Sequence, residues 1–387
     1  MNILQATKSY EDWMRTCTTL VESQLRDKHA RMKQDLFVFF RGTFYRWIQL
    51  RPKVGGDLRT APEVLAVGDL HVDSFGTWRD TEGRLAWGVD DFDESYPMSY
   101  TNDLVRLAAS VKIAIDSETL AIGLKKACEV ILNGYRDTLK NEGCPFVLAE
   151  QEQNLEKLGV REIVPPKDFW RRLNEGPAIR QTIPRAAKEA LEAKLPKGLD
   201  YRVILREAGT GSLGRQRFVA IGEWEGGYIA REAKAVTPSA CAWLDGRKGS
   251  LRSYYEDAIE AAVRSRDPFQ KIIKGWLIRR LSPIPIRSRS LIGRQNAMNR
   301  LFFTRWDARL PTSISERPAR SGKCRTTFSE ESPLGLDLLR SRWPSRLKQT
   351  GGTTSSRDAN RLPLESCAGG LNCQLGAARE ASERFAA

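Results

Sequence analysis

The chain is poor in the residues on which several enzyme classes depend. Only two of its 387 residues are histidines, His29 and His71, which is too few to build the two-metal site of a metallophosphoesterase. Its seven cysteines form no C-x-x-C pair, which argues against a zinc site. The G-x-S-x-G elbow that places the nucleophile of a serine hydrolase is also missing. We therefore do not expect any of these three classes.

Long apolar segments are missing as well. No run of about 18 apolar residues is present to span a membrane, and the N-terminus has no apolar core of a signal peptide. The scattered cysteines fit a reducing compartment better than a disulfide scaffold. At 387 residues the chain can hold two or three domains. We expect a cytoplasmic protein with a substantial core and no membrane partner.

A dense acidic segment, Val67–Glu94, carries eight carboxylates and one of the two histidines. Short strands are predicted in and beside it from runs of apolar and β-branched residues, over Val64–Val67, Ser74–Trp78 and Arg84–Val89. Asp69 then follows the first strand and Asp91 follows the hairpin, so both can converge on one point. Converging loop carboxylates are suited to Mg²⁺ and to a phosphoryl group.

A second pattern lies more than a hundred residues later, at Gly209–Gly214 (GTGSLG). Predicted strands flank it, over Tyr201–Leu205 and Arg217–Ile221. In a dinucleotide-binding fold the same glycine spacing would lead into a helix. A strand on both sides is instead typical of the loop that covers ATP phosphates in protein kinases, where a lysine on the next strand binds the α and β phosphates. Lys234 occupies that position.

Together these segments resemble the protein-kinase-like superfamily, and the aminoglycoside phosphotransferase branch in particular. That branch has a catalytic loop of the form H-G-D-x-H-x-x-N and a metal-binding Asp after a later hairpin. This chain has GDLHVDS at Gly68–Ser74, VDDFD at Val89–Asp93 and then NDL at Asn102–Leu104, like the Asp-Leu-Ala of the branch. Ordinary kinases place the glycine loop and its lysine before the catalytic loop. The resemblance therefore implies a circularly permuted, two-lobe α+β fold of the protein-kinase-like type, with the small-lobe strands after the catalytic loop.

The chain is more closely similar to an uncharacterised bacterial family, domain of unknown function 2252. The features that carry this resemblance are FFRG at Phe39–Gly42, the GDxH segment, the DFDE segment, the glycine loop and K-x-x-x-P-S at Lys234–Ser239. The resemblance covers residues 30–282. It divides the chain into 1–197 with the catalytic and metal-binding segments, 198–265 with the glycine loop, 266–282 as a return to the large lobe, and a tail over 283–387.

The resemblance also implies roles for individual residues. Asp69 would accept the proton of an attacking hydroxyl, and His71 would support it or face the substrate. Asp91 would hold Mg²⁺, with Asp93 and Ser74 as further candidate ligands. The nucleotide phosphates would be held by Lys234 and by the loop, at Gly209, Gly211, Ser212 and Gly214. The family has Asn where this chain has Ser74, and a hydroxyl is a weaker ligand for a second Mg²⁺.

Arg41 lies inside an aromatic-rich segment, Leu36–Leu50, that we expect to be core. If it is buried, it needs a partner, for which a site carboxylate and a phosphate are the candidates. Helices are predicted over Tyr10–Gln34, Asn102–Asp116, Thr119–Asn141 and Ser250–Val263, and mostly over Glu150–Lys197. Either Glu256 or Glu260 would pair with Lys234, as the glutamate of kinase helix C does; the sequence leaves both open.

The tail over residues 283–387 differs in composition from the rest. It has 18 basic and 9 acidic residues, so it supplies +9 of the formal charge of +14 and leaves +5 for the first 282 residues. Two origins remain open, a frameshifted reading of the gene and a disordered basic tail. Resequencing the DNA around codon 283 decides between them. Because most of the excess charge lies in the tail and no recognition motif accompanies it, nucleic-acid binding is the least favoured function.

The sequence thus predicts phosphoryl transfer from Mg²⁺-ATP to an unknown hydroxyl-bearing acceptor, either a small molecule or a protein. The alternative is a pseudokinase that binds the nucleotide but transfers nothing, which Ser74 and the unusual tail favour. Both bind nucleotide, and only the first turns it over.

Overall fold

The computed structural model of the chain describes residues 1–54, 58, 60–140, 143–148, 166–176, 179, 183–247, 252–283, 380 and 382–385. The fold is a mixed α+β arrangement, which confirms the predicted class at that level. The α-helices are α1 (Ile3–Cys17), α2 (Glu22–Gln34), α3 (Leu36–Gly42), α4 (Phe44–Val54), α5 (Thr101–Asp116), α6 (Leu124–Lys140), α9 (Pro166–Asn174), α10 (Arg185–Glu192), α11 (Ala240–Leu244) and α12 (Tyr255–Ala261). The strands are β1 (Glu63–Ala66), β2 (Phe75–Arg79), β3 (Leu85–Val89), β4 (Tyr96–Ser99), β5 (Arg202–Leu205), β6 (Arg217–Trp224), β7 (Gly227–Ala235), β8 (Lys271–Ile273) and β9 (Trp276–Leu281).

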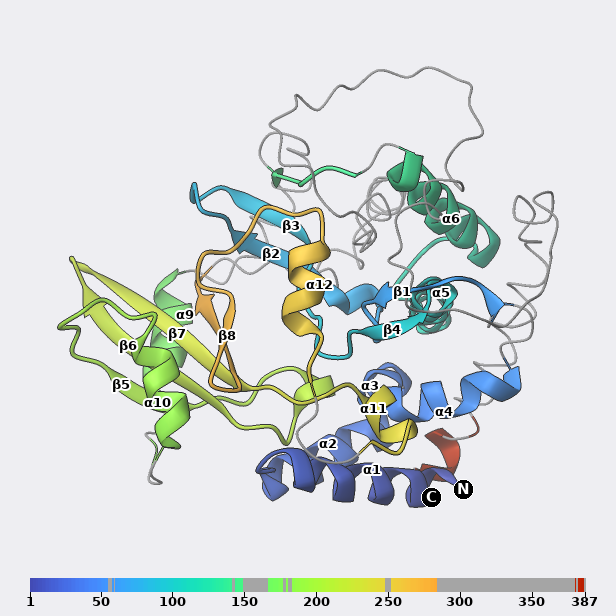
Figure 1. Cartoon of the computed structure of the whole chain (residues 1–387), viewed down its shortest axis with the longest axis horizontal. Coiled ribbons are helices and arrows are strands. Elements are labelled where there is room, and N and C mark those ends of the chain that lie inside the picture. The colour runs from blue at the N-terminus through green and yellow to red at the C-terminus, as the bar shows by residue number, and fades with distance from the viewer. Residues whose placement is uncertain are drawn as a thin grey trace.

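The helices α1 to α6 and two small sheets share one large core. Figure 1 shows how these elements are arranged. The aromatic segment predicted as core forms α3 and α4, and Phe39, Phe40 and Phe44 are almost completely buried in it. Helix α3 begins after Asp35, whose carboxylate accepts hydrogen bonds from the N–H groups of the next turn and so caps the helix. This cap sets where the helix begins, and Arg41 then lies in its last turn.

The single helix predicted over Tyr10–Gln34 is wrong, because the chain breaks into α1 and α2. Residues 18–21 are extended: Thr18 has φ −156° and ψ 161°, and Val21 has φ −97° and ψ 98°. β-Branched residues in this segment, Thr18 and Val21 among them, fit an extended backbone better than a helix. The break lets Val21 N–H donate to the carbonyl of Gly214 at 2.7 Å. The N-terminal helices thereby contact the end of the glycine loop.

Both small sheets are antiparallel pairs. Strand β1 pairs with β4, and β2 pairs with β3 through Phe75 opposite Val89 and Arg79 opposite Leu85. The three strands predicted around the acidic segment are therefore confirmed, and every end lies within one residue of its predicted position. Asp69 follows β1 and Asp91 follows β3, as the sequence indicates.

The glycine loop belongs to a five-stranded antiparallel sheet of order β5-β6-β7-β9-β8, on the left of Figure 1. The loop joins β5 to β6 and contains a 3-10 turn, η3 (Thr210–Ser212), and Lys234 lies on β7. Residues 266–282, expected to return to the large lobe, are instead part of this sheet, because β9 pairs with β7 along its whole length. Leu277 of β9 nevertheless reaches the large core.

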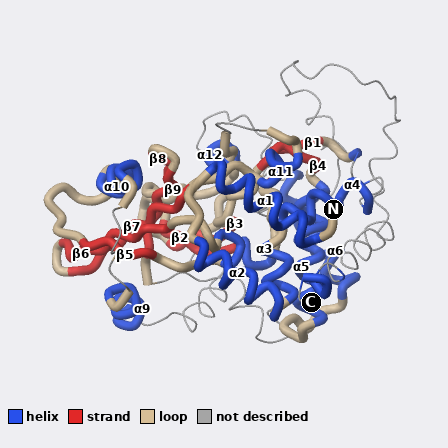
Figure 2. Tube along the Cα trace, turned by 90° about the horizontal axis from the view of Figure 1, so that it is seen from below, coloured by secondary structure: helices blue, strands red, loops and turns tan. Residues whose placement is uncertain are grey.

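Helices α9 and α10 cover opposite faces of the five-stranded sheet, as Figure 2 shows. Successive side chains of a strand point to opposite faces. Accordingly, Phe218 and Ala220 of β6 pack with α10, whereas Val219 and Ile221 pack near Leu173 of α9. The face that carries Val219 continues toward the glycine loop, where it also carries Arg217 of β6 and its partner Lys234.

The remaining expectations are met in part. Helix α5 lies where it is predicted, whereas α6 begins at Leu124 rather than Thr119, because residues 117–120 turn back onto α5 through hydrogen bonds to the carbonyls of its last turn. Helix α12 is shorter than predicted. Most of the tail lies outside the described residues, but Phe385 is buried against Phe39, at a ring separation of 5.7 Å. None of the helices described is both long and apolar enough to span a membrane.

Candidate functional site

The predicted site residues converge on a cleft made of two adjoining hollows. The first has an empty volume of about 470 Å³ including its open side, and Asp69 lines it. The second measures about 360 Å³ on the same basis, and Lys234 lines it. Residues from three elements line both hollows, namely Arg41, Asp91, Gly211 and Ser212. The cleft therefore brings together segments that are far apart in the sequence, such as those of Arg41, Lys234 and Arg279.

The NDL segment at the start of α5, Asn102–Leu104, holds the loop that carries Asp69 through hydrogen bonds. The carboxylate of Asp103 accepts hydrogen bonds from Val67 N–H at 2.7 Å and Gly68 N–H at 2.9 Å, and Asn102 donates to the Gly68 carbonyl at 2.9 Å. Burial raises the pKa of Asp103 to about 6, although the two N–H donors act in the other direction. Gly68 has φ +86°, and a Cβ atom there would lie 2.1 Å from the Glu94 carbonyl oxygen. Glycine is therefore required at the position before Asp69.

Asp69 pairs with a buried arginine that the sequence reasoning missed. Arg106 of α5 is fully buried, and its Nε donates to Asp69 Oδ1 at 2.5 Å. The guanidinium also donates to the Phe40 carbonyl and lies over the ring of Phe40, with 4.0 Å from Cζ to the centroid. Burial raises the pKa of Asp69, whereas Arg106 lowers it by favouring the carboxylate. The pair fixes the orientation of Asp69 and leaves its carboxylate 18% exposed at the cleft.

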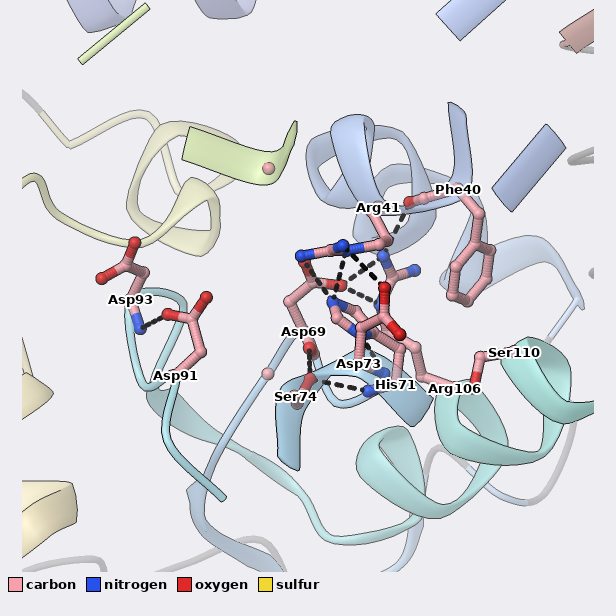
Figure 3. A network of polar contacts seen from close by, with 12 residues as sticks. Phe40, Arg41, Asp69, His71, Asp73, Ser74, Asp91, Asp93, Arg106 and Ser110 are labelled. Carbon is pink, nitrogen blue, oxygen red and sulfur yellow. Dashed lines mark hydrogen bonds and ion pairs between the residues drawn. The ribbon is translucent and has the colours of Figure 1, made fainter. Parts of the chain in front are cut away.

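His71, Arg41 and Asp73 form a second group beside Asp69, as Figure 3 shows. Arg41 donates from Nη1 to Asp73 Oδ2 at 2.9 Å, and its Nε lies 3.2 Å from His71 Nε2. The other ring nitrogen of His71 accepts from Asp73 N–H at 3.1 Å. His71 Nε2 lies 3.8 Å from Asp69 Oδ2, so the buried imidazole ring lies next to the Asp69 carboxylate. Arg41 has the carboxylate partner that its burial requires.

Ser74, the candidate for a second metal ligand, serves the loop itself. Its hydroxyl accepts from His71 N–H at 3.0 Å and donates to the Asp69 carbonyl at 3.1 Å, and the residue is fully buried. Together with His71 it caps a 3-10 turn, η2 (Val72–Ser74). The hydroxyl therefore contributes to the shape of the loop that holds Asp69.

The acidic loop after β3 faces Lys234. Lys234 forms an ion pair with Asp93 and lies 3.9 Å from Asp91 Oδ1. Burial lowers the pKa of Lys234 to about 8, although both carboxylates act to raise it. Asp93 also accepts from Arg215 at 2.7 Å. The expected pairing of Lys234 with Glu256 or Glu260 is not seen in the part of the chain that the structure describes; Glu256 instead accepts from Ile272 N–H at 2.9 Å.

Asp91 is the more accessible of the two carboxylates. Its side chain is 46% exposed, compared with 11% for Asp93, and it lines both hollows. Burial alone would raise the pKa of Asp91, but Lys234 and Arg215 hold it below its ordinary value, an effect that solvent weakens at such exposure. Within the described ranges, no group of three or more His, Cys, Asp or Glu side chains is arranged to hold a metal ion. Mg²⁺ is commonly held by one or two carboxylates together with substrate phosphates and water, and Asp91 fits that requirement.

The glycine loop is held by contacts at both ends. Gly209 and Gly214 have φ of +72° and +96°, a conformation that favours glycine. Gly214 N–H donates to Gln24 of α2 at 3.3 Å. Ser212 Oγ accepts from Arg217 of β6 and donates to the Gly209 carbonyl at 3.3 Å. Gly211 and Ser212 line both hollows, and Gly209 lines the second, so part of the predicted loop borders the cleft.

Several further ionisable residues of the cleft were not predicted, Lys28 and Glu94 among them. Lys28 of α2 is buried, and its Nζ lies 3.5 Å from the Gly211 carbonyl; burial lowers its pKa to about 8. Glu94 accepts from Ala240 N–H at 2.7 Å, and burial raises its pKa to about 7. The DFDE pattern marks Glu94 only as one more acidic residue, and nothing local distinguishes Lys28 from the other basic residues of α2.

Comparison with known proteins supports one part of the predicted resemblance. Residues 20–157 match the model of a family described as "Uncharacterized protein conserved in bacteria" (DUF2252). No curated protein and no solved structure matches the chain. The matched range includes Arg41, Asp69 and Asp91 but ends before the glycine loop and Lys234. The first part of the chain is therefore similar to this uncharacterised bacterial family.

Proposed function

We propose that the protein is a Mg²⁺-dependent phosphotransferase of the protein-kinase-like type, with ATP as donor and a hydroxyl group as acceptor. The observation that carries this proposal is the meeting of the two hollows. Asp69 lines the first and Lys234 the second, while Asp91 and the glycine loop border both. A phosphoryl group that passes between a donor in the second hollow and an acceptor in the first would cross that shared boundary.

The glycine loop and Lys234 support a donor site in the second hollow. Backbone N–H groups of a glycine loop between two strands and a lysine on the next strand are the parts that kinases use on nucleotide phosphates. Here β5, the loop, β6 and Lys234 on β7 follow in that order within one sheet. Asp91 would hold Mg²⁺, which, when bound, neutralises phosphate charge. Asp93 would release Lys234 to the phosphates.

Asp69 supports an acceptor site in the first hollow. In the proposed step the acceptor hydroxyl oxygen forms a bond to the γ phosphorus, and the bond from that phosphorus to the bridging oxygen breaks, which releases ADP. The hydroxyl proton passes to Asp69. Arg106 pairs with that carboxylate and fixes its orientation, while burial raises the pKa of Asp69 and so favours acceptance of the proton. Phosphoryl transfer depends mainly on positioning and charge neutralisation, which fixed loops provide.

Calorimetry with Mg²⁺-ATP tests the donor site. We expect the wild type to bind, and Lys234→Ala and Asp91→Asn each to weaken binding by about tenfold or more, the loss of one charge-assisted contact. Matched controls are Lys271→Ala and Asp200→Asn, which remove exposed side chains away from the cleft and should bind like the wild type. A folded wild type that shows no binding would overturn the proposal.

A pseudokinase that binds the nucleotide without transfer is the second candidate. The observation in its favour is Ser74, which stands where the family has Asn and whose hydroxyl is used within its own loop. Phosphate release or transfer, measured on the same preparation that binds Mg²⁺-ATP, separates the two. Turnover that is lost in Asp69→Asn supports the phosphotransferase, and binding with no turnover for any acceptor offered supports the pseudokinase.

A further inference from the structure

The second hollow, which the glycine loop borders, has an unusual lining for a nucleotide site. Its lining consists of charged side chains, one serine and glycines, namely Arg41, Asp90, Asp91, Gly209, Gly211, Ser212, Arg217, Lys234 and Arg279. No described residue of this lining has an apolar or aromatic side chain. Small-molecule sites are mostly apolar and aromatic with a few polar groups, and bases are held by stacking on such surfaces. Among the described residues, this hollow therefore offers a base no apolar or aromatic surface on which to stack.

The sheet face explains why the lining is charged. Cross-strand partners on this face form successive rows across β6, β7 and β9. The row farthest from the glycine loop is apolar, with Ile221, Ala230 and Leu281. Closer to the loop come Val219 with Glu232 and Arg279, and then Arg217 with Lys234 and Leu277, so the polarity of the face changes along the strands.

Glu232 organises the charged part. It is fully buried and accepts from Arg206 at 2.7 Å, Arg279 at 2.6 Å and Arg217 at 3.3 Å. Burial alone would raise the pKa of Glu232, but the three arginines hold it well below its ordinary value. One carboxylate therefore orients three guanidinium groups, and their excess positive charge is directed at the region of the second hollow, where Arg217 and Arg279 line the wall. Arg217 Nε is buried without a hydrogen-bond partner among the described atoms.

The charge of the lining favours an anion. Four cations, Arg41, Arg217, Lys234 and Arg279, and two carboxylates, Asp90 and Asp91, line the hollow. When the ion-pair partners Asp73, Asp93 and Glu232 and the arginines that share them, Arg206 and Arg215, are counted as well, six cations face five carboxylates, an excess of one positive charge. Asp91 is also the carboxylate suited to Mg²⁺. Arginine binds phosphate through two parallel hydrogen bonds, so a set of oriented arginines is suited to a chain of phosphates.

The first hollow does not supply the missing stacking surface. Its aromatic residues are Tyr10, Phe44 and Tyr45. Tyr10 and Tyr45 stack on each other at 4.4 Å and meet Trp243 edge to face, and Arg106 lies over Phe44 at 5.0 Å. All three rings are buried, so their faces are occupied by the core.

We propose that the donor site recognises the polyphosphate chain with its Mg²⁺ and not the base, so that the donor class is any compound with a terminal triphosphate, inorganic tripolyphosphate included. This inference rests on the proposed function for the position of the donor site. The proposed function names ATP as the donor, whereas in this inference the protein does not recognise the adenine base. The chemistry of transfer is unchanged, because the bond that breaks is again the one from the terminal phosphorus to its bridging oxygen.

The test is calorimetry on the full chain with Mg²⁺-ATP, Mg²⁺-GTP, Mg²⁺-tripolyphosphate and adenosine. We expect the three phosphate compounds to bind with dissociation constants within about fivefold of one another, equal to about 1 kcal/mol, and adenosine not to bind. ATP that binds more than about fivefold tighter than tripolyphosphate, or adenosine that binds alone, overturns the inference and leaves the proposed function standing. No binding of any phosphate compound overturns both.

A pair of neighbouring arginines on β9 gives a matched control. Arg279 faces the hollow, whereas Arg280 points to the other face, where it lies over Phe269 at 4.5 Å. Arg279→Gln should weaken the binding of all three phosphate compounds by the same factor of about ten. Arg280→Gln should leave the binding of all three unchanged. Thermal melting checks that both variants fold. If Arg279→Gln weakened the binding of ATP but not that of tripolyphosphate, recognition of the phosphate chain would be contradicted.

Discussion

Replacement of Arg106 by methionine measures how far the cleft depends on one buried ion pair. The guanidinium is fully buried, donates to Asp69 at 2.5 Å and to the Phe40 carbonyl at 2.9 Å, and lies over the Phe40 ring. Methionine fills much of the same volume but supplies neither the charge nor the donors. The variant therefore leaves the Asp69 carboxylate and the Phe40 carbonyl without this partner.

The expected loss follows from the burial of the pair. Removal of one partner from a buried ion pair costs about 3–5 kcal/mol, because the remaining charge is uncompensated. Asp69 is 18% exposed and can regain some hydration, so we expect the lower end, about 3 kcal/mol. Asp69→Asn removes the charge that needs compensation. The double variant should therefore be more stable than the sum of the two single losses predicts, by about 1–2 kcal/mol.

Urea denaturation at pH 7, followed by tryptophan fluorescence, gives the four unfolding free energies of this cycle. Lys8→Met serves as control, because it breaks an exposed pair with Asp12 in which the lysine side chain is 78% exposed, and it should cost less than about 1 kcal/mol. If the two single losses add to within about 0.5 kcal/mol, Asp69 and Arg106 are energetically independent, and the reasoning from burial is refuted.

Two further predictions concern the loops beside Asp69. Gly68→Ala should destabilise the protein by at least about 2 kcal/mol more than Gly83→Ala, because both glycines have positive φ but only at Gly68 would a Cβ meet a backbone oxygen, at 2.1 Å; equal melting temperatures would contradict this. Glu94→Gln should change the pH dependence of stability. Burial raises the pKa of Glu94 from 4.5 to about 7, so its contribution is fully present below pH 4.5 and is lost as the pH rises through 7. The unfolding free energy of the variant relative to the wild type should therefore increase between pH 4.5 and 8, by at most about 3 kcal/mol since water reaches the cleft; a constant difference would exclude Glu94 as its source.

Local signals in the sequence predict the parts of the fold that are governed by local physics. Alternating apolar residues and turn signals locate β1, β2 and β3, and the positions of Asp69 and Asp91 follow from them. The break between α1 and α2 was not predicted, because its extended backbone is stabilised by a contact with Gly214, nearly two hundred residues away. Local periodicity carries no information about such a contact.

The same distinction applies to the cleft. The resemblance to the kinase-like superfamily implied that Asp69, Asp91 and the glycine loop belong to one site, and it left the partner of Arg41 open. In the structure each of Arg41, Asp69, Asp91, Gly209, Gly211 and Ser212 lines at least one of the two hollows, whereas Gly214 lines neither. The resemblance did not identify Arg106 as the partner of Asp69, because an arginine inside an apolar helix shows its role only when its neighbours are known. It also led us to expect Glu256 or Glu260 as the partner of Lys234, whereas the lysine pairs with Asp93, more than a hundred residues earlier in the chain, a contact that no local pattern indicates.

The ion pair between Asp93 and Lys234 gives the cleft an internal competitor. Asp93 holds both Lys234 and Arg215 with a single carboxylate, so an incoming anion reaches the lysine only by displacing a side chain that is already present at very high local concentration. A singly charged anion gains too little from that exchange. A ligand that brings several charges, or a metal ion that draws the acidic loop toward itself, makes the exchange favourable. In the proposed donor site, this competition would favour multiply charged ligands over simple monovalent anions.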